Sequence, residues 1–124
     1  MTPEEKQLLL IDLCARLPYK VKLDFYSKAM DEHFTCTLLG IEPDGDMPII
    51  AKVDIGAFTF TADHVKPYLR PMSSMTEEEK DTYDTMVMSN ASWVVDDWLN
   101  AHYLDYRDLI GKGLSLEAPT DMYN

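Results

Sequence analysis

The chain has 124 residues, a length typical of one domain, and its hydrophobic fraction of 46% is ordinary for a protein that buries one core. It has 22 acidic and 11 basic residues, a formal net charge of −11, and residues 72–124 contribute 11 of the acids but 3 of the bases. A field of this sign repels nucleic acid and anionic lipid and favours a basic partner. The simpler alternative is that the acids keep a small protein soluble.

The N-terminal stretch MTPEEKQLLLIDLCARLP does not resemble a secretory signal, because acids precede its apolar run and Asp12 and Arg16 interrupt it. No stretch approaches the roughly 20 apolar residues of a membrane-spanning helix. Cys14 and Cys36 are too few for a disulfide framework, and we expect both to be small core residues in a reducing compartment. These features predict a cytoplasmic protein without a membrane partner.

Residues 2–17 are predicted to form a helix. Thr2 is a favourable N-cap, and Glu5 lies three residues later, which completes a capping box. Apolar residues then recur at spacings of three and four, which indicates one buried face. That face consists of Leu9, Leu10, Leu13, Cys14 and Leu17. Pro18 is expected to end the helix.

The apolar period then changes to 2, which predicts strands with one wet face. The predicted strands are residues 20–25, 33–41, 49–55 and 58–61. The turn EPDGD at 42–46 separates the second and third strands, and a tight turn at Gly56 separates the third and fourth. Short turns favour a four-stranded antiparallel meander, which either stays open or curls into a small SH3-like barrel. Residues 63–71, DHVKPYLRP, contain two prolines and are expected to form a turn and an extended connector.

A second helical region is predicted to begin at Thr76, which forms another capping box with Glu79. Its expected buried stripe consists of Tyr83, Met86 and Val87. SNAS, residues 89–92, is expected to break the region into two helices, with one long helix as the alternative.

Gly111 and Gly113 are expected to stop the last helical turn, and the tail SLEAPTDMYN is expected to be polar and partly loose. The predicted fold is a single α+β domain over residues 1–124. It comprises an N-terminal helix, the four-stranded meander and two C-terminal helices packed against the meander.

Catalytic and cofactor motifs are missing from the sequence. His33 and Cys36 are three apart on a predicted strand, so they would face opposite sides and would not share a metal. Gly111-Lys112-Gly113 follows a predicted helix and lacks the spacing of a phosphate-binding loop. No G-x-S-x-G is present. We therefore predict no enzyme, no catalytic residue, no bound metal and no cofactor.

Aromatic residues gather near the C-terminus, where Trp93 falls off the predicted apolar stripe and Trp98 falls on it. Trp, Tyr and Arg are the residues that dominate protein–protein hot spots. Two readings stay open, because the cluster could instead pack on the sheet with its tyrosine hydroxyls in water. The predicted partner-binding residues are Trp93, Asp97, His102, Tyr106 and Arg107.

Three segments carry a resemblance. They are LPYKVKLD (17–24), DHVKPYLRPMSSMTEEEK (63–80) and DWLNAHYLDYRDLIGKGLSLEAPTDMYN (97–124), which cover a little under half of the chain. The chain resembles a family of small proteins, with no assigned activity, from phages, prophages and genomes of gut Bacteroidetes. This resemblance implies the cytoplasm of a bacterial host cell as the setting. It implies no activity and no site residue.

These observations favour a non-enzymatic function. We expect a small phage-type accessory or adaptor protein that binds another, basic protein through an acidic, aromatic-bearing surface. Its most specific form is an inhibitor of a basic, nucleic-acid-binding host protein, with no direct contact to nucleic acid. The alternatives are a small-anion-binding domain, with His102, Tyr106 and Arg107 at the mouth of a pocket, and a virion or assembly component that self-associates.

Overall fold

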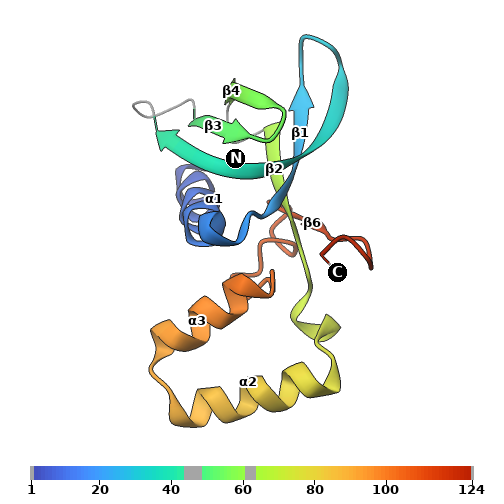
Figure 1. Ribbon diagram of the computed structural model, residues 1–124. Helices are drawn as coiled ribbons and strands as arrows, with labels where there is room; N and C mark the ends of the chain where they lie inside the picture. The colour runs from blue at the N-terminus through green and yellow to red at the C-terminus, as the bar shows by residue number, and fades with distance from the viewer. Residues whose placement is uncertain (1, 44–48, 61–63, 124) are drawn as a thin grey trace.

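The computed structural model has an α+β fold and describes residues 2–43, 49–60 and 64–123 (Figure 1). The helices of this part are α1 (Pro3–Arg16), α2 (Glu77–Ser89) and α3 (Ser92–Ala101), with short 3-10 turns η1 (Leu17–Tyr19) and η3 (Met72–Ser74). The strands are β1 (Lys22–Ser27), β2 (Glu32–Pro43), β3 (Ile49–Val53), β4 (Gly56–Phe60), β5 (Val65–Leu69) and β6 (Leu116–Glu117). Among the described residues, no helix combines the length and apolar character required to cross a membrane.

Helix α1 has the capping box that its sequence predicts. The Glu5 N–H donates to Thr2 Oγ1 at 3.1 Å, and the Thr2 N–H donates to Glu5 Oε1 at 2.9 Å. These bonds to Thr2 stabilise the charged carboxylate and hold the pKa of Glu5 below its ordinary value. At the other end η1 contains Pro18, and Lys20, with φ 54°, turns the chain into β1.

The meander is present, but it is only part of a larger mixed sheet. Strands β1 to β4 pair antiparallel in chain order, as predicted. The full order is β4-β3-β2-β1-β5-β6, with β5 antiparallel to β1 and β6 parallel to β5. This order is linear, so the described strands form an open sheet with β4 and β6 at its edges.

Residues 63–71 were predicted to be a connector, and that prediction is wrong for Val65–Leu69. These residues form β5, which lies between β1 and β6. Val65, Pro67 and Leu69 are buried and alternate with half-exposed neighbours. Pro67, opposite Leu23, has no N–H to donate to a ladder, which is why proline argues against a strand in sequence. Here the burial of alternate side chains outweighs the missing donor.

The tail is fixed to the sheet rather than partly loose. Directly after the short strand β6, the Ala118 N–H donates to the Leu69 carbonyl at 2.8 Å. The Tyr123 hydroxyl accepts from the Lys22 N–H at 2.9 Å and donates to the Tyr68 carbonyl at 2.7 Å. This residue is largely buried, which raises the pKa of its phenol well above the ordinary value.

The main core lies between α1 and the sheet. Its buried members are Leu9, Leu13, Val21, Leu23, Phe25, Cys36, Leu38, Val53, Val65, Leu69, Leu109 and Leu114. Burial of Cys36, as predicted, raises the pKa of its thiol to about 11. The same prediction is wrong for Cys14, which is exposed. The face that α1 buries consists of Leu9, Asp12, Leu13 and Arg16, and it leaves Cys14 outside.

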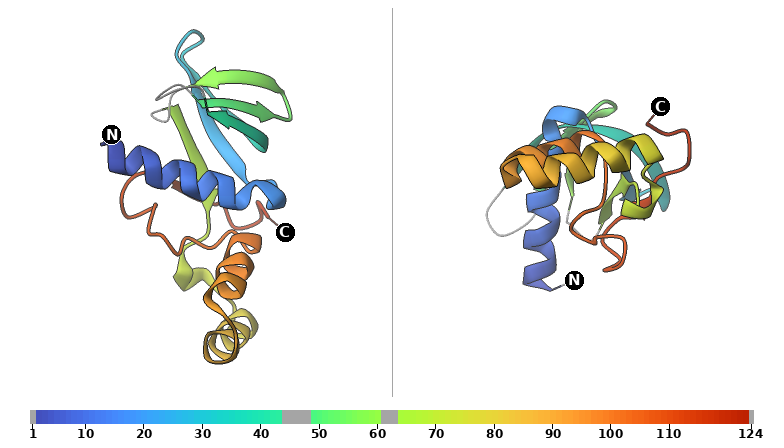
Figure 2. Two further views of the ribbon diagram at one scale, coloured as in Figure 1. Left: turned by 90° about the vertical axis from the view of Figure 1, so that its left-hand side faces the viewer. Right: turned by 90° about the horizontal axis from the view of Figure 1, so that it is seen from below.

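Helices α2 and α3 are separate, as predicted, and together form a helical hairpin (77–101). The helical hairpin begins with the capping box of Thr76 and Glu79. The Thr76 N–H donates to Glu79 Oε1 at 2.9 Å, and the Glu79 N–H donates to Thr76 Oγ1 at 3.1 Å. The hairpin does not pack against the sheet as predicted, because α1 lies between the two (Figures 1 and 2). Helix α3 contacts α1, and the hairpin has a smaller core of its own. That core is built on Val95, Leu99 and Leu104, with Met72, Met75, Tyr83, Met86, Trp98 and Tyr106 packed around them.

The predicted turns have mixed outcomes. Val53 pairs with Gly56 (φ 138°), so a tight turn is present there. Gly111 and Gly113 do not end a helix, because α3 ends at Ala101 and the chain turns away at Tyr103, with φ 60°. The predicted turn at 42–46 overlaps β2 at its first two residues and otherwise lies outside the described residues. The side chains of Phe58 and Phe60 lie outside them too.

Candidate functional site

Strand β5 leads into Arg70, whose backbone joins the sheet to the segment after α3. The Arg70 N–H donates to the Tyr103 carbonyl at 2.7 Å, and the Asp105 N–H donates to the Arg70 carbonyl at 2.8 Å. Arg70 and Leu104 thereby form a parallel bridge. The Arg70 side chain therefore starts where β5, η3 and the end of α3 meet.

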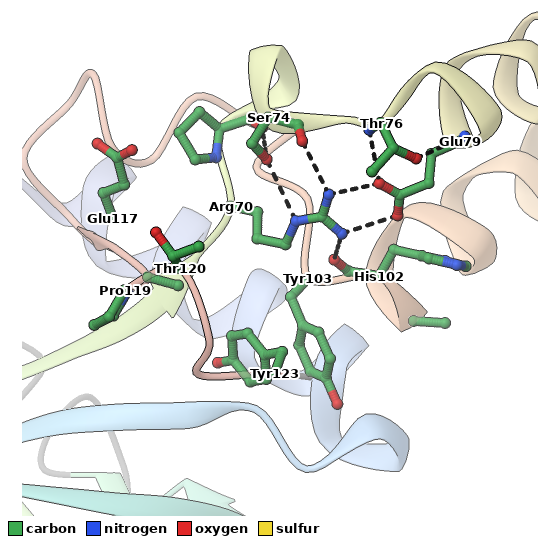
Figure 3. A pocket seen from close by; sticks show the side chains of 13 residues that line it. Arg70, Ser74, Thr76, Glu79, His102, Tyr103, Glu117, Pro119, Thr120 and Tyr123 are labelled. Atoms are coloured by element: carbon green, nitrogen blue, oxygen red, sulfur yellow. Dashed lines mark hydrogen bonds and ion pairs between the residues drawn. The ribbon is translucent and has the colours of Figure 1, made fainter.

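The Arg70 guanidinium holds these elements together, and all five of its N–H bonds have an acceptor (Figure 3). Nη1 and Nη2 donate to the two carboxylate oxygens of Glu79 at 2.9 and 2.7 Å. Nη1 also donates to the His102 carbonyl at 3.3 Å. Nε and Nη2 donate to the hydroxyl and the carbonyl of Ser74 at 3.3 and 3.2 Å. We call these four residues the Arg70 clamp.

Glu79 accepts hydrogen bonds both from Arg70 in the clamp and from the N-cap residue of α2. Its Oε1 accepts from both the Arg70 guanidinium and the Thr76 N–H. The hydrogen bonds from Arg70, aided by that from Thr76, lower the pKa of Glu79 to about 2. A bidentate carboxylate–guanidinium pair is also geometrically specific. The clamp therefore fixes where α2 begins relative to the sheet.

A pocket of about 560 Å³ lies beside the clamp, and we call it the junction pocket. Its volume is in the range of small-molecule sites. Below the clamp in Figure 3 lie the rings of Tyr103 and Tyr123, stacked at 3.6 Å between centroids and 7° between planes. The lining residues are Arg70, Pro71, Ser74, Thr76, Glu79, Ala101, His102, Tyr103, Glu117, Ala118, Pro119, Thr120 and Tyr123.

His102 borders the junction pocket with a defined tautomer. Its Nδ1 lies 2.8 Å from the Trp98 carbonyl, which can only accept, so Nδ1 carries a proton. The ring packs on Trp98 with centroids 4.2 Å apart. In the neutral imidazole, Nε2 is therefore the acceptor.

A buried polar network lies apart from the junction pocket. Asp12 and Arg16 are fully buried, and the Arg16 Nε and Nη2 donate to both Asp12 oxygens at 2.9 and 3.1 Å. Arg107 donates to Asp12 Oδ1 at 2.7 Å and lies over the Tyr106 ring, 4.4 Å from its centroid. Arg16 also donates to the Leu104 carbonyl at 2.8 Å. This network ties α1 to the segment that follows α3.

The tip of the helical hairpin, where α2 joins α3, carries three exposed large apolar side chains. Met88 is 88% exposed, Trp93 is 73% exposed and Val87 is 52% exposed. Val87 was predicted to be buried, and that prediction is wrong because α2 packs through Tyr83 and Met86 alone. We call Val87, Met88 and Trp93 the apolar tip.

The structure places the five predicted partner-binding residues in four locations. Trp93 lies in the apolar tip. Asp97 accepts a hydrogen bond from the Tyr19 hydroxyl, and His102 borders the junction pocket. Tyr106 and Arg107 belong to the buried network around Asp12, so they do not share a surface with Trp93. The predicted pocket mouth of His102, Tyr106 and Arg107 is not formed either, because the arginine that lines the pocket is Arg70.

Several residues of these sites were missed from the sequence. Arg70 and Glu79 are nine apart and on different elements, so no local pattern pairs them. Asp12 and Arg16 have the i, i+4 spacing of a helical ion pair, but the same two residues also interrupt an apolar run, which does not indicate that they are buried. Among the described residues, no group of three or more His, Cys, Asp or Glu side chains could hold a metal ion.

Comparisons with protein-family models, with curated proteins and with solved structures find no match. No relative is therefore at hand whose site could be aligned with this chain.

Proposed function

We propose that the chain is a non-enzymatic binding module that docks a basic protein through the helical hairpin, with the apolar tip inserted into an apolar recess of that partner. The observation that carries the proposal is the exposure of Met88 and Trp93, at 88% and 73%. Neighbouring large apolar side chains this exposed are characteristic of interaction sites. Trp is also among the residues that contribute most at interfaces.

The charge of the helical hairpin indicates the sign of the partner. Residues 77–101 contain seven acids and one base, a net charge of −6 in a chain of net −11. All of the acids but Glu79 are exposed. A basic rim around the partner's recess would therefore match the surface that surrounds the apolar tip. Such pairing speeds association and weakens as salt rises.

The way the hairpin is held supports a docking role. Helix α2 has no buried residue, so its stability comes from its caps, the Arg70 clamp and the small core. Helix α3 is tied to η1 by the hydrogen bond from Tyr19 to Asp97. A projecting element fixed at its base presents the apolar tip with little loss of conformational entropy on binding.

In its most specific form, the proposal is an inhibitor of a nucleic-acid-binding protein of the bacterial host. The acidic hairpin would then occupy the basic surface that otherwise contacts phosphates. The small-anion alternative has less support, because Arg70 has all its donors engaged and Arg107 is bound to Asp12.

The test is capture of a partner from bacterial lysate at low and high salt, followed by purification of that partner and measurement of its Kd. We expect one basic protein, bound more weakly at high salt. The double variant Met88→Ser/Trp93→Ala should raise the Kd by at least about tenfold, as expected for truncated hot-spot residues.

Met30→Ser is the matched control, because Met30 is also an exposed methionine, at 62%, in the β1–β2 turn away from the hairpin. It should leave the Kd unchanged. Equal affinity of the wild type and the double variant, or no partner at either salt concentration, would overturn the proposal.

A further inference from the structure

The junction pocket is a second candidate site, distinct from the apolar tip. We infer that it binds a guanidinium group, presented either by an arginine side chain of a protein or by a small free guanidine compound. The inference rests on which hydrogen-bonding groups of the lining are already engaged, and on the charges that remain.

The side-chain donors of the lining are almost all engaged within the protein. The five N–H bonds of Arg70 go to Ser74, Glu79 and His102. Four other donations are Ser74 Oγ to the Pro71 carbonyl, Tyr103 Oη to the Tyr19 carbonyl, Tyr123 Oη to the Tyr68 carbonyl and His102 Nδ1 to the Trp98 carbonyl. Among the lining side chains, only the hydroxyls of Thr76 and Thr120 have an O–H group that is not engaged by an acceptor within the described part of the chain. A ligand rich in acceptors, such as phosphate, would therefore find few partners.

The acceptors of the same lining are in surplus. Within the described part of the chain, no hydrogen bond or ion pair engages the Glu117 carboxylate, which is exposed beside the pocket. Glu79 Oε2 accepts from Arg70 alone, which leaves one of its lone pairs unused. A ligand that complements this lining must therefore supply hydrogen-bond donors.

The charge of the lining points the same way. Its ionised side chains are one cation, Arg70, and two carboxylates, Glu79 and Glu117. The pair of Arg70 and Glu79 is mutually neutralised by its bidentate contact, so Glu117 leaves the pocket with an excess negative charge. A guanidinium carries a positive charge, five donors and no acceptor, which makes it the most complementary common biological group.

The size of the pocket and its aromatic residues are compatible with this ligand. About 560 Å³ exceeds the volume of one arginine side chain, so neighbouring backbone or a linker can enter as well. The rings of Tyr103 and Tyr123 lie next to the space, together with Pro119 and the aliphatic part of Arg70 (Figure 3). Such flat surfaces suit a planar guanidinium better than a compact ammonium.

The test is an NMR titration of the ¹⁵N-labelled chain with N-acetyl-L-arginine methylamide and, as a matched control, N-acetyl-L-citrulline methylamide. Citrulline has nearly the same shape but carries a neutral urea. We expect the arginine compound to shift the amides of Ser74, His102, Glu117, Ala118 and Thr120 and to bind at least about tenfold more tightly than citrulline, since charge-assisted hydrogen bonds are the stronger ones.

Two variants sharpen the result. Glu117→Gln should weaken arginine binding by about tenfold, because it removes the unpaired charge. Glu4→Gln, an exposed carboxylate in the first turn of α1, should not change it. Thermal unfolding of both variants checks that the fold is intact. The Met88→Ser/Trp93→Ala variant should bind arginine normally, so this site and the docking function succeed or fail separately.

A short peptide with one central arginine distinguishes the two sources of the ligand. Tighter binding of the peptide than of the amide identifies a protein side chain, and equal binding identifies a small compound. Equal affinity for arginine and citrulline, shifts confined to other regions, no effect of Glu117→Gln, or pocket shifts with inorganic phosphate alone would each overturn the inference.

Discussion

The body of the molecule, made of α1 and the sheet, and the helical hairpin are stabilised in different ways. In the body, apolar side chains from α1, four strands and the segment 109–114 meet in one core, and Leu9, Leu23, Leu38 and Leu69 have no exposed surface. The hairpin buries Val95, Leu99 and Asn100 from α3 and nothing from α2. Polar contacts at its base replace the missing apolar burial.

This difference suggests a division of roles. Apolar burial is the main source of folding free energy, so the body accounts for most of the stability of the chain. A hairpin held by a small apolar core, by hydrogen bonds and by an ion pair can expose Met88 and Trp93 without weakening the body. Sites that bind partners are commonly placed on such less stable elements.

The largest effect is expected in the body, from Asp12→Ala. This change removes the carboxylate that pairs with Arg16 and Arg107, and it leaves a fully buried guanidinium without its counter-charge. We expect a loss of about 3–5 kcal/mol in the free energy of unfolding, measured by urea denaturation. Asp84→Ala, at an exposed aspartate of α2, should change it by less than about 0.5 kcal/mol. Similar losses for the two variants would remove the contrast between body and hairpin.

Next in size is Leu99→Ala in the small core of the hairpin. Leu99 is 3% exposed, and its truncation should cost about 2 kcal/mol, at the low end for a buried leucine because few neighbours surround it. In hydrogen exchange, the amides of α2 and α3 should lose protection while those of β1 keep theirs. Val87→Ala, at an exposed position of the same hairpin, is the control. Equal loss of protection in β1 would show that body and hairpin unfold as one unit.

The smallest effect is expected from Glu79→Gln, at about 1 kcal/mol near neutral pH, because the pair with Arg70 is partly exposed. The folded pKa of Glu79, about 2, lies below its ordinary value of 4.5. Its stabilising contribution is therefore complete above pH 4.5 and is lost as the pH falls toward 2. Helical circular dichroism of the wild type should decline over this window, with a shallower decline in the variant. Parallel pH profiles would contradict a role of the ion pair in holding α2.

The local features of the fold were predictable, whereas the long-range ones were not. Both capping boxes and the break between α2 and α3 follow from short-range rules and are present. The four-stranded meander was predicted only in part, because β1 to β4 pair antiparallel within a larger mixed sheet. Strand β5 was missed because two prolines outweighed the alternation of Val65, Pro67 and Leu69. The position of the hairpin was missed because nothing in its own pattern indicates that α1 lies between it and the sheet.

The candidate sites show the same difference between local features, which were predictable, and long-range contacts, which were not. The off-stripe position of Trp93 was apparent from helical periodicity, and the residue is exposed. The Arg70 clamp and the place of Arg107 beside Asp12 depend on contacts between residues 9 and 95 positions apart. Such pairings are set by tertiary packing, so composition and spacing alone predicted a single surface for residues that the structure places in four locations.

The hydrogen bond between Tyr123 and Lys22 spans 101 residues and has a consequence for biosynthesis. At about 5–20 residues per second, a ribosome needs roughly 5 to 20 seconds to travel between these two positions. Throughout that interval β1 exists without β6 and without Tyr123, and β5, once it has been synthesised, lacks both as well. The native sheet can therefore be completed only after residue 123 has left the exit tunnel, and until then β5 presents an unpaired edge, which is a template for aggregation.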